Sequence, residues 1–524
     1  MRLRPVLTVV AVLLVLTGCD PAPAATSPAA TSPAAVARPS ATSGAISPDR
    51  QTLAPVTVRP AGFGTAPVGE GLAGYLGQAL PWKACGQDQC ATVQVPLDYA
   101  NPSEQAITLA LRKRPATRSP RLGSLIMNPG GPGAGGQWMA GWMAGKGLDA
   151  YDLIGLDVRG TGDSTPVSCW SDAEEDAFLA LDFSPDDTTE MNTLVSQSRA
   201  FAAACWRTNG DYLNHLSSVE IARDLDVLRK LLGDDKLHFL GFSYGTMLGA
   251  TYAELFPDKV GHLVLDSPVS LADKEEVFQT AGFELAFNHW TQYCASTGCA
   301  SGGVNLGTTP QAVHDAVAAW LAKLDGAPVT VGKRTLTQSL ATMGVAGLLY
   351  QSSEWPALRT ALLAAMAGNG AQLLASADGM SDRNKNGHYG TLPYVLPATY
   401  CLDFRDTGIA GALADWETQK ATVGMFGSLN GLDLSCATWA VPPNPYLDFK
   451  AVGAAPILVV GSTGDPATPY QLSEHVSNHL TSAVLLTYDG EGHGTFGGSS
   501  TCVNDAVVAY FTRDVVPVAG TRCR

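Results

Sequence analysis

The sequence predicts an α/β fold in which a mostly parallel sheet of eight strands carries a large, mainly helical insertion. Short apolar runs alternate with segments patterned as helices, and such alternation is typical of a parallel sheet covered by helices. The alternation breaks after the sixth strand, where residues 270–452 contain helix-like and loop sequence. We therefore expect a cap inserted into the sheet domain. The expected strands are residues 92–97, 107–112, 122–127, 151–157, 237–242, 262–266, 456–460 and 484–488.

The first residues have the pattern of an exported protein. Two arginines precede an apolar stretch at residues 5–16, which is too short to span a bilayer but suits the core of a signal peptide. The following Leu16-Thr-Gly-Cys19 resembles a bacterial lipobox, so we expect residues 1–18 to be removed and Cys19 to carry a lipid. The alternative is a cysteine that merely lies near a signal peptidase site. The expected location is extracytoplasmic, either lipid-anchored to the cell membrane or secreted.

The rest of the chain divides into a spacer and a folded part. Residues 19–51 are almost entirely Ala, Pro, Ser and Thr, a composition that buries too little apolar surface to offset the entropy of ordering. The folded part divides into residues 52–269 and 453–524, which form the sheet domain, and residues 270–452, which form the cap. Within the sheet domain, Ser217 and Glu220 predict a capping box at the start of a helix.

One serine lies where a strand turns sharply into a helix. Ser243 is the centre of Gly-Phe-Ser-Tyr-Gly, which follows the apolar run 237–242 and precedes the helix-like segment 246–256. Glycines flank the turn because a side chain there would clash, and this arrangement is a nucleophile elbow. The motif alone is a weak signal in a chain with 55 glycines, where a turn serine is the ordinary alternative. The strand and helix around it favour the elbow.

A serine nucleophile needs a base and a group that orients the base. Asp465 follows the apolar run 456–460, and His493 follows the run 484–488. The carboxyl ends of parallel strands meet at one edge of a sheet, so these residues are expected to converge. Taken singly, Asp465 has an ordinary reading as a turn former and His493 as a loop histidine. Their order after Ser243 is that of the α/β-hydrolase fold.

Acyl transfer also requires hydrogen-bond donors for the developing oxyanion. The loop Asn128-Pro-Gly-Gly-Pro-Gly133 follows the third expected strand, and its glycines let the backbone approach a substrate oxygen closely. We expect the amide of Gly131 to be one donor. The amide of Tyr244, at the start of the helix after the nucleophile, is expected to be the other.

These motifs resemble a known family. The chain contains Asn-Pro-Gly-Gly-Pro-Gly, Leu156-Asp-Val-Arg-Gly-Thr-Gly-Asp-Ser164, Gly-Phe-Ser-Tyr-Gly, Gly-Asp-Pro-Ala-Thr-Pro and Gly-Glu-Gly-His, which are similar to motifs of secreted tripeptidyl aminopeptidases among the proline-iminopeptidase-like serine peptidases. The resemblance extends from about Trp82 to the C-terminus. Proline iminopeptidases read His-Gly-Gly-Pro-Gly, and Pro129 replaces that histidine here, which favours the tripeptidyl branch. The resemblance implies the triad roles of Ser243, Asp465 and His493.

A large cap over the strand ends favours short peptides or chain ends as substrates. The cap therefore favours an exopeptidase, and the resemblance implies that it releases tripeptides from free N-termini through an acyl-enzyme. Recognition of the substrate's ammonium group needs a carboxylate, and Asp403 is our candidate, with the acidic stretch 172–190 as a weaker one. An ordinary solvated acidic surface is the alternative for both.

The cysteines agree with an oxidising location. The chain has 11 cysteines, and setting Cys19 aside leaves an even number. Pairing of sequence neighbours is our guess at the connectivity. The expected pairs are Cys85 with Cys90, Cys169 with Cys205, Cys294 with Cys299, Cys401 with Cys436, and Cys502 with Cys523.

Other ligand classes receive little support. The net charge of −15 disfavours nucleic acid and anionic lipid, leaving peptides as partners and a membrane contact only through the lipid. His475 and His479 share a helix face without a third ligand, and residues 382–387 imitate a calcium loop whose twelfth position is Pro393. We expect no metal and no cofactor.

Two further functions remain open at this stage. A carboxylesterase or lipase would use the same machinery on the same fold. A non-catalytic, peptide-binding surface lipoprotein is the second alternative, although such a protein has no reason to keep the three triad residues at strand ends.

Overall fold

The computed structural model describes residues 64–272 and 277–524. The expected signal peptide, Cys19 and the spacer 19–51 therefore lie outside the described residues. Among the helices of the described ranges, none combines the length and the apolar character that a bilayer crossing requires.

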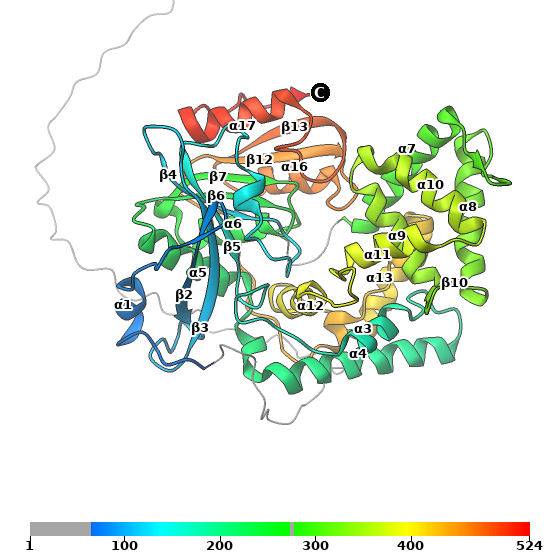
Figure 1. Cartoon of the computed structure of the whole chain (residues 1–524), viewed down its shortest axis with the longest axis horizontal. Helices are drawn as coiled ribbons and strands as arrows, with labels where there is room; N and C mark the ends of the chain where they lie inside the picture. Colours follow the sequence, from blue (N-terminus) through cyan, green and yellow to red (C-terminus); the bar gives the residue numbers. More distant parts are fainter. Residues whose placement is uncertain (1–63, 273–276) are drawn as a thin grey trace, which may run out of the picture. The chain divides into compact units, whose positions relative to one another are not determined.

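A ten-stranded sheet forms the centre of the sheet domain (Figure 1). Its strand order is β1-β2-β3-β5-β4-β6-β7-β12-β13-β14. The strands are β1 (Lys83–Cys85), β2 (Asp88–Pro96), β3 (Ala106–Arg114), β4 (Gly123–Asn128), β5 (Tyr151–Asp157), β6 (Leu237–Phe242), β7 (Val260–Asp266), β12 (Ile457–Gly464), β13 (Ala483–Glu491) and β14 (Arg522–Cys523). The pairs β1–β2, β2–β3 and β3–β5 are antiparallel, and all other pairs of this sheet are parallel. The predicted fold class is confirmed, and two short edge strands extend the eight expected strands to ten.

Alternating side chains of the central strands face two separate apolar layers. Ile126 and Phe239 belong to one buried cluster, whereas their neighbours Met127 and Leu240 belong to another. Helices α5 (Ser218–Leu231), α6 (Gly245–Leu255) and α16 (Tyr470–His479) contribute to the first cluster, and α2 (Met139–Trp142) and α17 (Thr501–Arg513) contribute to the second. Figure 1 shows α17 beside the end of the sheet that contains β13. Burial on both faces explains why the strands read as continuous apolar runs.

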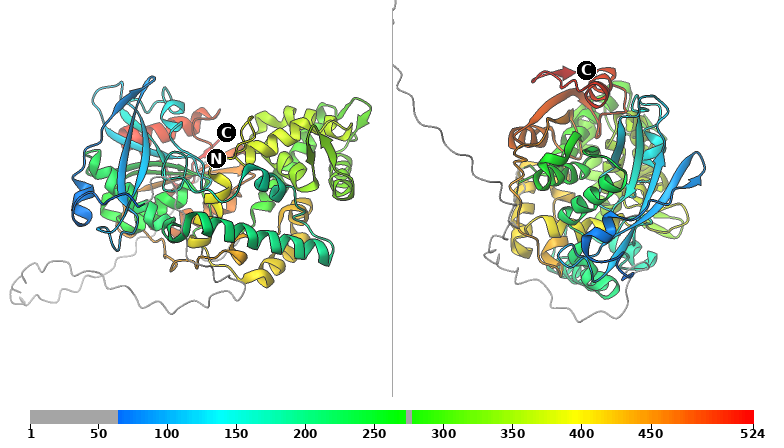
Figure 2. Two further views of the ribbon diagram at one scale, coloured as in Figure 1. Left: turned by 60° about the horizontal axis from the view of Figure 1, so that its bottom comes forward. Right: turned by 90° about the vertical axis from the view of Figure 1, so that its left-hand side faces the viewer.

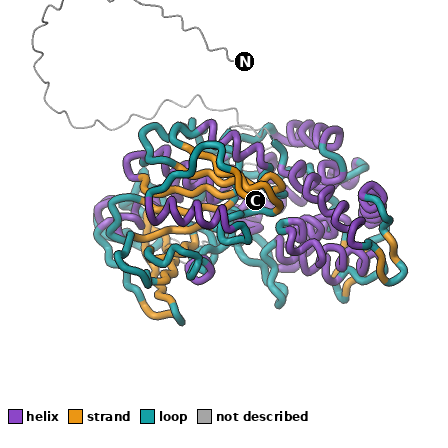
Figure 3. Tube along the Cα trace, turned by 90° about the horizontal axis from the view of Figure 1, so that it is seen from above, coloured by secondary structure: helices purple, strands orange, loops and turns teal. Residues whose placement is uncertain are grey.

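The cap has an apolar core of its own, built mainly by α7 to α11 and α14. These helices gather beside the sheet (Figures 1 and 3). The elements between β7 and β12 are α7 (Gln279–Thr297), β8 (Ala300–Ser301), β9 (Val304–Asn305), α8 (Pro310–Gly326), β10 (Val329–Val331), β11 (Arg334–Leu336), α9 (Gln338–Leu349), η3 (Ser352–Glu354), α10 (Trp355–Met366), α11 (Ala371–Met380), α12 (Leu392–Asp403), α13 (Gly408–Thr422), α14 (Met425–Asn430) and α15 (Ser435–Thr438).

A second segment of the cap comes from the part of the chain that precedes β6. It contains α3 (Asp172–Leu179) and α4 (Thr188–Asn209), and α4 extends from the sheet domain to the cap helices (Figure 2). Asp172 Oδ2 lies 2.7 Å from His388 Nδ1, and the Phe183 amide donates to Ser339 Oγ at 3.2 Å. The cap therefore combines residues 279–438 with a segment that the sequence assigned to the sheet domain. The remaining short elements are α1 (Gly71–Leu76), η1 (Gly210–His215) and η2 (Pro257–Lys259).

The predicted capping box before α5 forms only in half. Ser217 is the N-cap residue, and its hydroxyl accepts the Glu220 amide at 3.4 Å. The Glu220 carboxylate instead accepts from Arg223 at 2.7 Å and lies 3.7 Å from the buried Arg159. The reciprocal half of the prediction is wrong because two guanidinium groups compete for the carboxylate more strongly than a backbone amide.

Candidate active site

The segment around Ser243 is a sharp, strained turn between β6 and α6. Ser243 has a φ of +54°, an uncommon conformation for a residue with a side chain, and its amide donates to the Asp266 carbonyl at 3.0 Å. A Cβ on Gly241 would lie 2.3 Å from the Gly245 carbonyl oxygen, and a Cβ on Gly245 would lie 2.9 Å from the Asn128 carbonyl oxygen. The two flanking glycines are therefore required by close backbone packing. The turn leaves Ser243 partly exposed.

The glycine loop after β4 packs directly on this turn. Gly130 has a φ of +100°, and a Cβ there would lie 2.8 Å from Ser243 Cβ and 2.7 Å from the Phe242 carbonyl oxygen. The Gly130 amide already donates to Asn128 Oδ1 at 2.9 Å. Among residues 64–272 and 277–524, the amides of Gly131 and Tyr244 have no assigned acceptor, so both are free to bind an oxyanion.

Gly130→Ala is expected to lower kcat/KM at least about 100-fold, because displacing the reacting groups by about 1 Å has an effect of that size. The added methyl group collides with the turn that carries Ser243. Gly145→Ala is the matched control, since Gly145 also has a positive φ of +79° but has open space around it. Gly145→Ala should lower the free energy of unfolding by only about 1–2 kcal/mol, the cost of the backbone strain, and should retain activity. Equal activities of the two variants, measured with a chromogenic ester, would refute the collision.

Asp465 and His493 are hydrogen-bonded to each other beyond the ends of β12 and β13. His493 Nδ1 lies 2.9 Å from Oδ1 and 3.1 Å from Oδ2 of Asp465, whose side chain is 1% exposed. The carboxylate also accepts the amides of Ala467 and Thr468, each at 2.9 Å. The His493 amide donates to the Tyr350 carbonyl of the cap at 2.9 Å. A carboxylate can only accept, so Nδ1 carries the proton and Nε2 is left as a base.

The surroundings of His493 stabilise its protonated imidazole relative to a histidine in water. Burial lowers the pKa of His493, but the charge and hydrogen bond of Asp465, with a smaller contribution from Asp266, outweigh burial and raise this pKa above the ordinary histidine value. Burial raises the pKa of Asp266 to about 6, against the opposing effect of the Phe496 and Thr495 amides. Asp465 and Asp266 therefore both favour the charged form of the imidazole.

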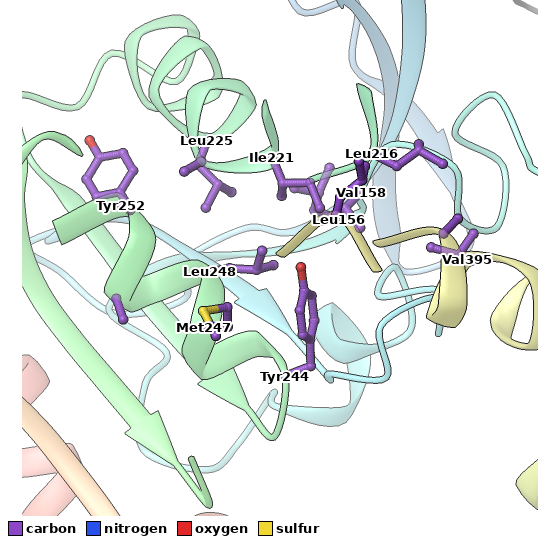
Figure 4. Close-up of a cluster of buried hydrophobic side chains, with 14 of the residues drawn as sticks. Leu156, Val158, Leu216, Ile221, Leu225, Tyr244, Met247, Leu248, Tyr252 and Val395 are labelled. Carbon is purple, nitrogen blue, oxygen red and sulfur yellow. The ribbon is translucent and has the colours of Figure 1, made fainter. Parts of the chain in front are cut away.

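Tyr244 fixes the first turn of α6 in the core. Its ring lies among apolar side chains of the surrounding elements, including Leu156, Leu248 and Val395 (Figure 4). Its hydroxyl lies 2.6 Å from Ser218 Oγ and donates to Asp403 Oδ2 at 3.2 Å. The tyrosine side chain thus anchors the segment whose backbone amide we expect in the oxyanion hole.

Asp403 is the last residue of α12 and lies next to the Tyr244 hydroxyl. Its carboxylate accepts the amide and hydroxyl of Ser218 at 3.0 and 2.6 Å, and burial raises its pKa to about 6. Asp403 and Ser218 line a small pocket together with Met247 and Phe404, and Ser243 is not among its lining residues in the described chain. The ammonium-binding role of Asp403 therefore stays a prediction.

Two residues near the acid and the base were not predicted from the sequence. Thr468 Oγ1 lies 3.1 Å from Asp465 Oδ2 and 3.3 Å from His493 Nδ1. Asp266 accepts the amides of Thr495 and Phe496, two and three residues after His493. The spacing Asp-x-x-Thr, in which the aspartate accepts amides two and three positions on, is a signal that could have identified Thr468. Asp266 could have been noticed as a second carboxylate at a strand end, in addition to Asp465.

The described cysteines form the five predicted pairs. Cys401–Cys436 joins α12 to α15, and Cys502–Cys523 joins α17 to β14. Cys19, which was predicted to carry the lipid, lies outside the described residues.

Several groups have the ligand types of a metal site but are engaged otherwise. His479 Nε2 lies 2.5 Å from the Asp448 carbonyl oxygen, and the Asn384 side chain accepts the amides of Asn386 and His388 within its own turn. Asp98, His215 and Glu220 also lie close together, as do Asp182, Glu190 and Asp325. Arg159 and Arg223 pair with Glu220 in the first group, and in the second group Asp182 accepts the Ser184 amide while Glu190 accepts the amides of Asp186 and Asp187.

Comparison with known proteins agrees with this geometry. Residues 123–497 match the model of the alpha/beta hydrolase fold family. The serine protease Hip1 of Mycobacterium tuberculosis is 32% identical over 86% of this chain and 91% of its own length. The tripeptidyl aminopeptidase of Streptomyces lividans is 32% identical over 82% of this chain and 84% of its own, and carboxylesterase B of M. tuberculosis is 35% identical over 83% and 86%. The chain therefore belongs to the α/β-hydrolase fold family and is a serine hydrolase, related to the tripeptidyl aminopeptidases that its motifs resemble.

Proposed function

We propose that this serine hydrolase is an exopeptidase that releases short peptides, in particular tripeptides, from free N-termini. The observation that carries the proposal is the hydrogen-bonded Asp465–His493 pair at the same sheet edge as the strained Ser243 turn. The large cap beside that edge supports short or terminal peptides as substrates. Relatives named as a serine protease and a tripeptidyl aminopeptidase support peptide hydrolysis.

In the proposed mechanism, Ser243 Oγ attacks the scissile carbonyl carbon and His493 Nε2 takes the hydroxyl proton. Asp465 keeps the imidazole oriented and stabilises its charged form. The amides of Gly131 and Tyr244 donate to the oxyanion. His493 then gives the proton to the leaving amine as the C–N bond breaks, and water hydrolyses the acyl-enzyme by the same steps in reverse order. The chain's own residues supply every group in this scheme.

The pH dependence of kcat/KM should report the ionisation of His493. Only the neutral imidazole accepts the proton of Ser243, so activity falls as the pH drops through the His493 pKa in the free enzyme. Because the net effect of its surroundings raises this pKa, the acid limb should lie above the ordinary histidine value of about 6.5. Initial rates from pH 5 to pH 9 measure it. A limb below pH 6 would contradict the proposed role of Asp465.

The substrate class is tested with tripeptide anilides that have a free or an acetylated N-terminus, together with a short-chain ester. Mature protein should cleave the free-amine peptide and release an intact tripeptide, which mass spectrometry identifies. Asp403→Asn should raise KM for the free-amine peptide if Asp403 binds the ammonium, and leave the acetylated peptide and the ester unchanged. Equal cleavage of free and acetylated peptides would reject the aminopeptidase proposal.

A carboxylesterase is the second candidate, supported by the relative named carboxylesterase B. Its identity to this chain is similar to that of the named peptidases, so overall similarity does not separate the two reactions. Hydrolysis of the ester alone, with no anilide cleaved, would favour the esterase.

We also propose an extracytoplasmic location with a lipid on Cys19. The disulfide pairs of the described chain and the relatives named as a serine protease and a tripeptidyl aminopeptidase support the location. Metabolic labelling with a palmitate analogue should mark the wild-type chain and not Cys19→Ser. Equal labelling of both chains would reject the lipid.

A further inference from the structure

The last residue of β7 and its successor, Asp266 and Ser267, lie between the loops that carry Ser243, Asp465 and His493. Both residues are fully buried, with 0% of their surface exposed. Buried polar side chains of this kind are retained only where hydrogen bonds satisfy them. The mechanism above gives the Asp266–Ser267 segment no role.

The strongest contacts go to the loop that follows His493. The Asp266 carboxylate accepts the Thr495 amide at 3.0 and 3.1 Å and the Phe496 amide at 2.7 Å. Ser267 Oγ accepts the Gly494 amide at 2.9 Å. Three successive amides after the base are thus held by two adjacent side chains, which fixes the direction in which the loop leaves His493.

The other two loops bind the backbone of the same segment. The Asp266 carbonyl accepts the amide of Ser243 at 3.0 Å, and the Ser267 carbonyl lies 3.0 Å from the Thr468 hydroxyl. Thr468 in turn contacts the carboxylate of Asp465. Ser267 has a φ of +57°, which is strained for a residue with a side chain and is retained only where the surroundings over-determine it.

We propose that the Asp266–Ser267 segment positions the catalytic base relative to the nucleophile and the acid, and that the Asp266 carboxylate stabilises the imidazolium of His493 as a second negative charge. Asp266 is a positioning residue, because it acts through His493 and its loop. This inference rests on the proposed triad and not on the identity of the substrate.

The electrostatic half of the proposal depends on the groups around His493. These are Asp465, which hydrogen-bonds Nδ1, Asp266, which holds the Thr495 amide two residues after His493, and the Tyr350 ring of the cap, which packs edge-on at 5.5 Å. Burial raises the pKa of Tyr350 above its ordinary value, so its phenol stays neutral. Asp266 is therefore the second charge that the imidazole meets, after Asp465.

Asp266→Asn tests this role because the amide keeps an oxygen that accepts hydrogen bonds but loses the charge. The acid limb of kcat/KM for the ester should move to lower pH by about 0.5–1 unit, since removing a nearby negative charge lowers the pKa of an imidazole. We expect kcat to fall about 10- to 100-fold with KM nearly unchanged, as for loss of an interaction made in the transition state. An unchanged acid limb and unchanged kcat would overturn the proposal.

Two further variants make the result unambiguous. Asp234→Asn is the matched control, because Asp234 is a partly buried carboxylate that accepts the Ser124 amide at the start of β4, at the opposite end of the strand. It should leave the acid limb in place. Ser267→Gly suits the positive φ and removes the hydroxyl that holds the Gly494 amide. A lower kcat in this variant would support the positioning role even if Asp266→Asn fails to fold, and a wild-type kcat would overturn that role.

If a fluorophosphonate probe does not label the wild-type protein, the proposed function itself is rejected.

Discussion

Replacing Ser243 with alanine is expected to lower kcat/KM about 10⁴- to 10⁶-fold, because it removes the hydroxyl that forms the acyl-enzyme in the proposed mechanism. The elbow holds the Ser243 backbone at a strained positive φ, next to Gly130 and directly before Tyr244. Alanine keeps the Cβ that packs against this loop, so the fold should be retained. The measurement is initial-rate kinetics with the ester and the anilide, together with labelling by a fluorophosphonate probe, which Ser243→Ala should abolish.

Ser296→Ala is the matched control for this variant. Ser296 is exposed on cap helix α7, where its hydroxyl donates to the Tyr293 carbonyl. Its removal should leave rates and labelling at the wild-type level. If Ser243→Ala were still labelled, or retained more than about one per cent of the activity, another nucleophile would be responsible and the proposed mechanism would fail.

The sheet was predictable because each central strand is buried on both faces and is therefore a continuous apolar run. β5 and β6 have the bounds that the sequence predicts. β1 and β14 were missed because they contain only 3 and 2 residues, too few for any periodicity to appear. Their positions depend on the partner strands β2 and β13, which local sequence does not identify.

The composition of the cap was less accessible to sequence reasoning. The contact of Asp172 with His388 joins residues 216 positions apart, and neither residue belongs to a pattern that indicates the other. Leu194 of α4 likewise packs with Trp416 of α13 in a small apolar cluster. Such pairings arise from tertiary packing of amphipathic helices, whose apolar faces reveal that a partner exists but not which one.

The candidate site divides in the same way. Ser243, Asp465 and His493 could be proposed because strand ends, glycines and chain order are local signals. The roles of Asp266 and Thr468 emerge only when the loops are brought together, since their partners Phe496 and Ser267 lie 230 and 201 positions away. For Asp403 the sequence suggested a role in binding but not the side chains that surround it. In the structure, Ser218 and Tyr244 donate hydrogen bonds to its carboxylate.

Asp465→Asn is expected to lower kcat about 10⁴-fold, because an asparagine in this position stabilises the wrong tautomer of the base. The carboxylate of Asp465 accepts from His493 Nδ1 and from the amides of Ala467 and Thr468. The asparagine oxygen can keep the hydrogen bonds from these two amides, and its NH₂ group then points toward the imidazole. His493 must then accept at Nδ1 and carry its proton at Nε2, where it cannot take the proton of Ser243.

Comparison with Asp266→Asn separates tautomer control from charge. Each variant removes one buried negative charge near His493, but of the two aspartates only Asp465 contacts the ring nitrogen, whereas Asp266 binds backbone amides. Asp465→Asn should therefore lose far more activity, and its rate of labelling by the fluorophosphonate probe should fall in parallel, since labelling requires the same proton transfer. Losses of equal size in the two variants would mean that the imidazole is stabilised by charge alone, and the orienting role assigned to the Asp465 hydrogen bond would have to be abandoned.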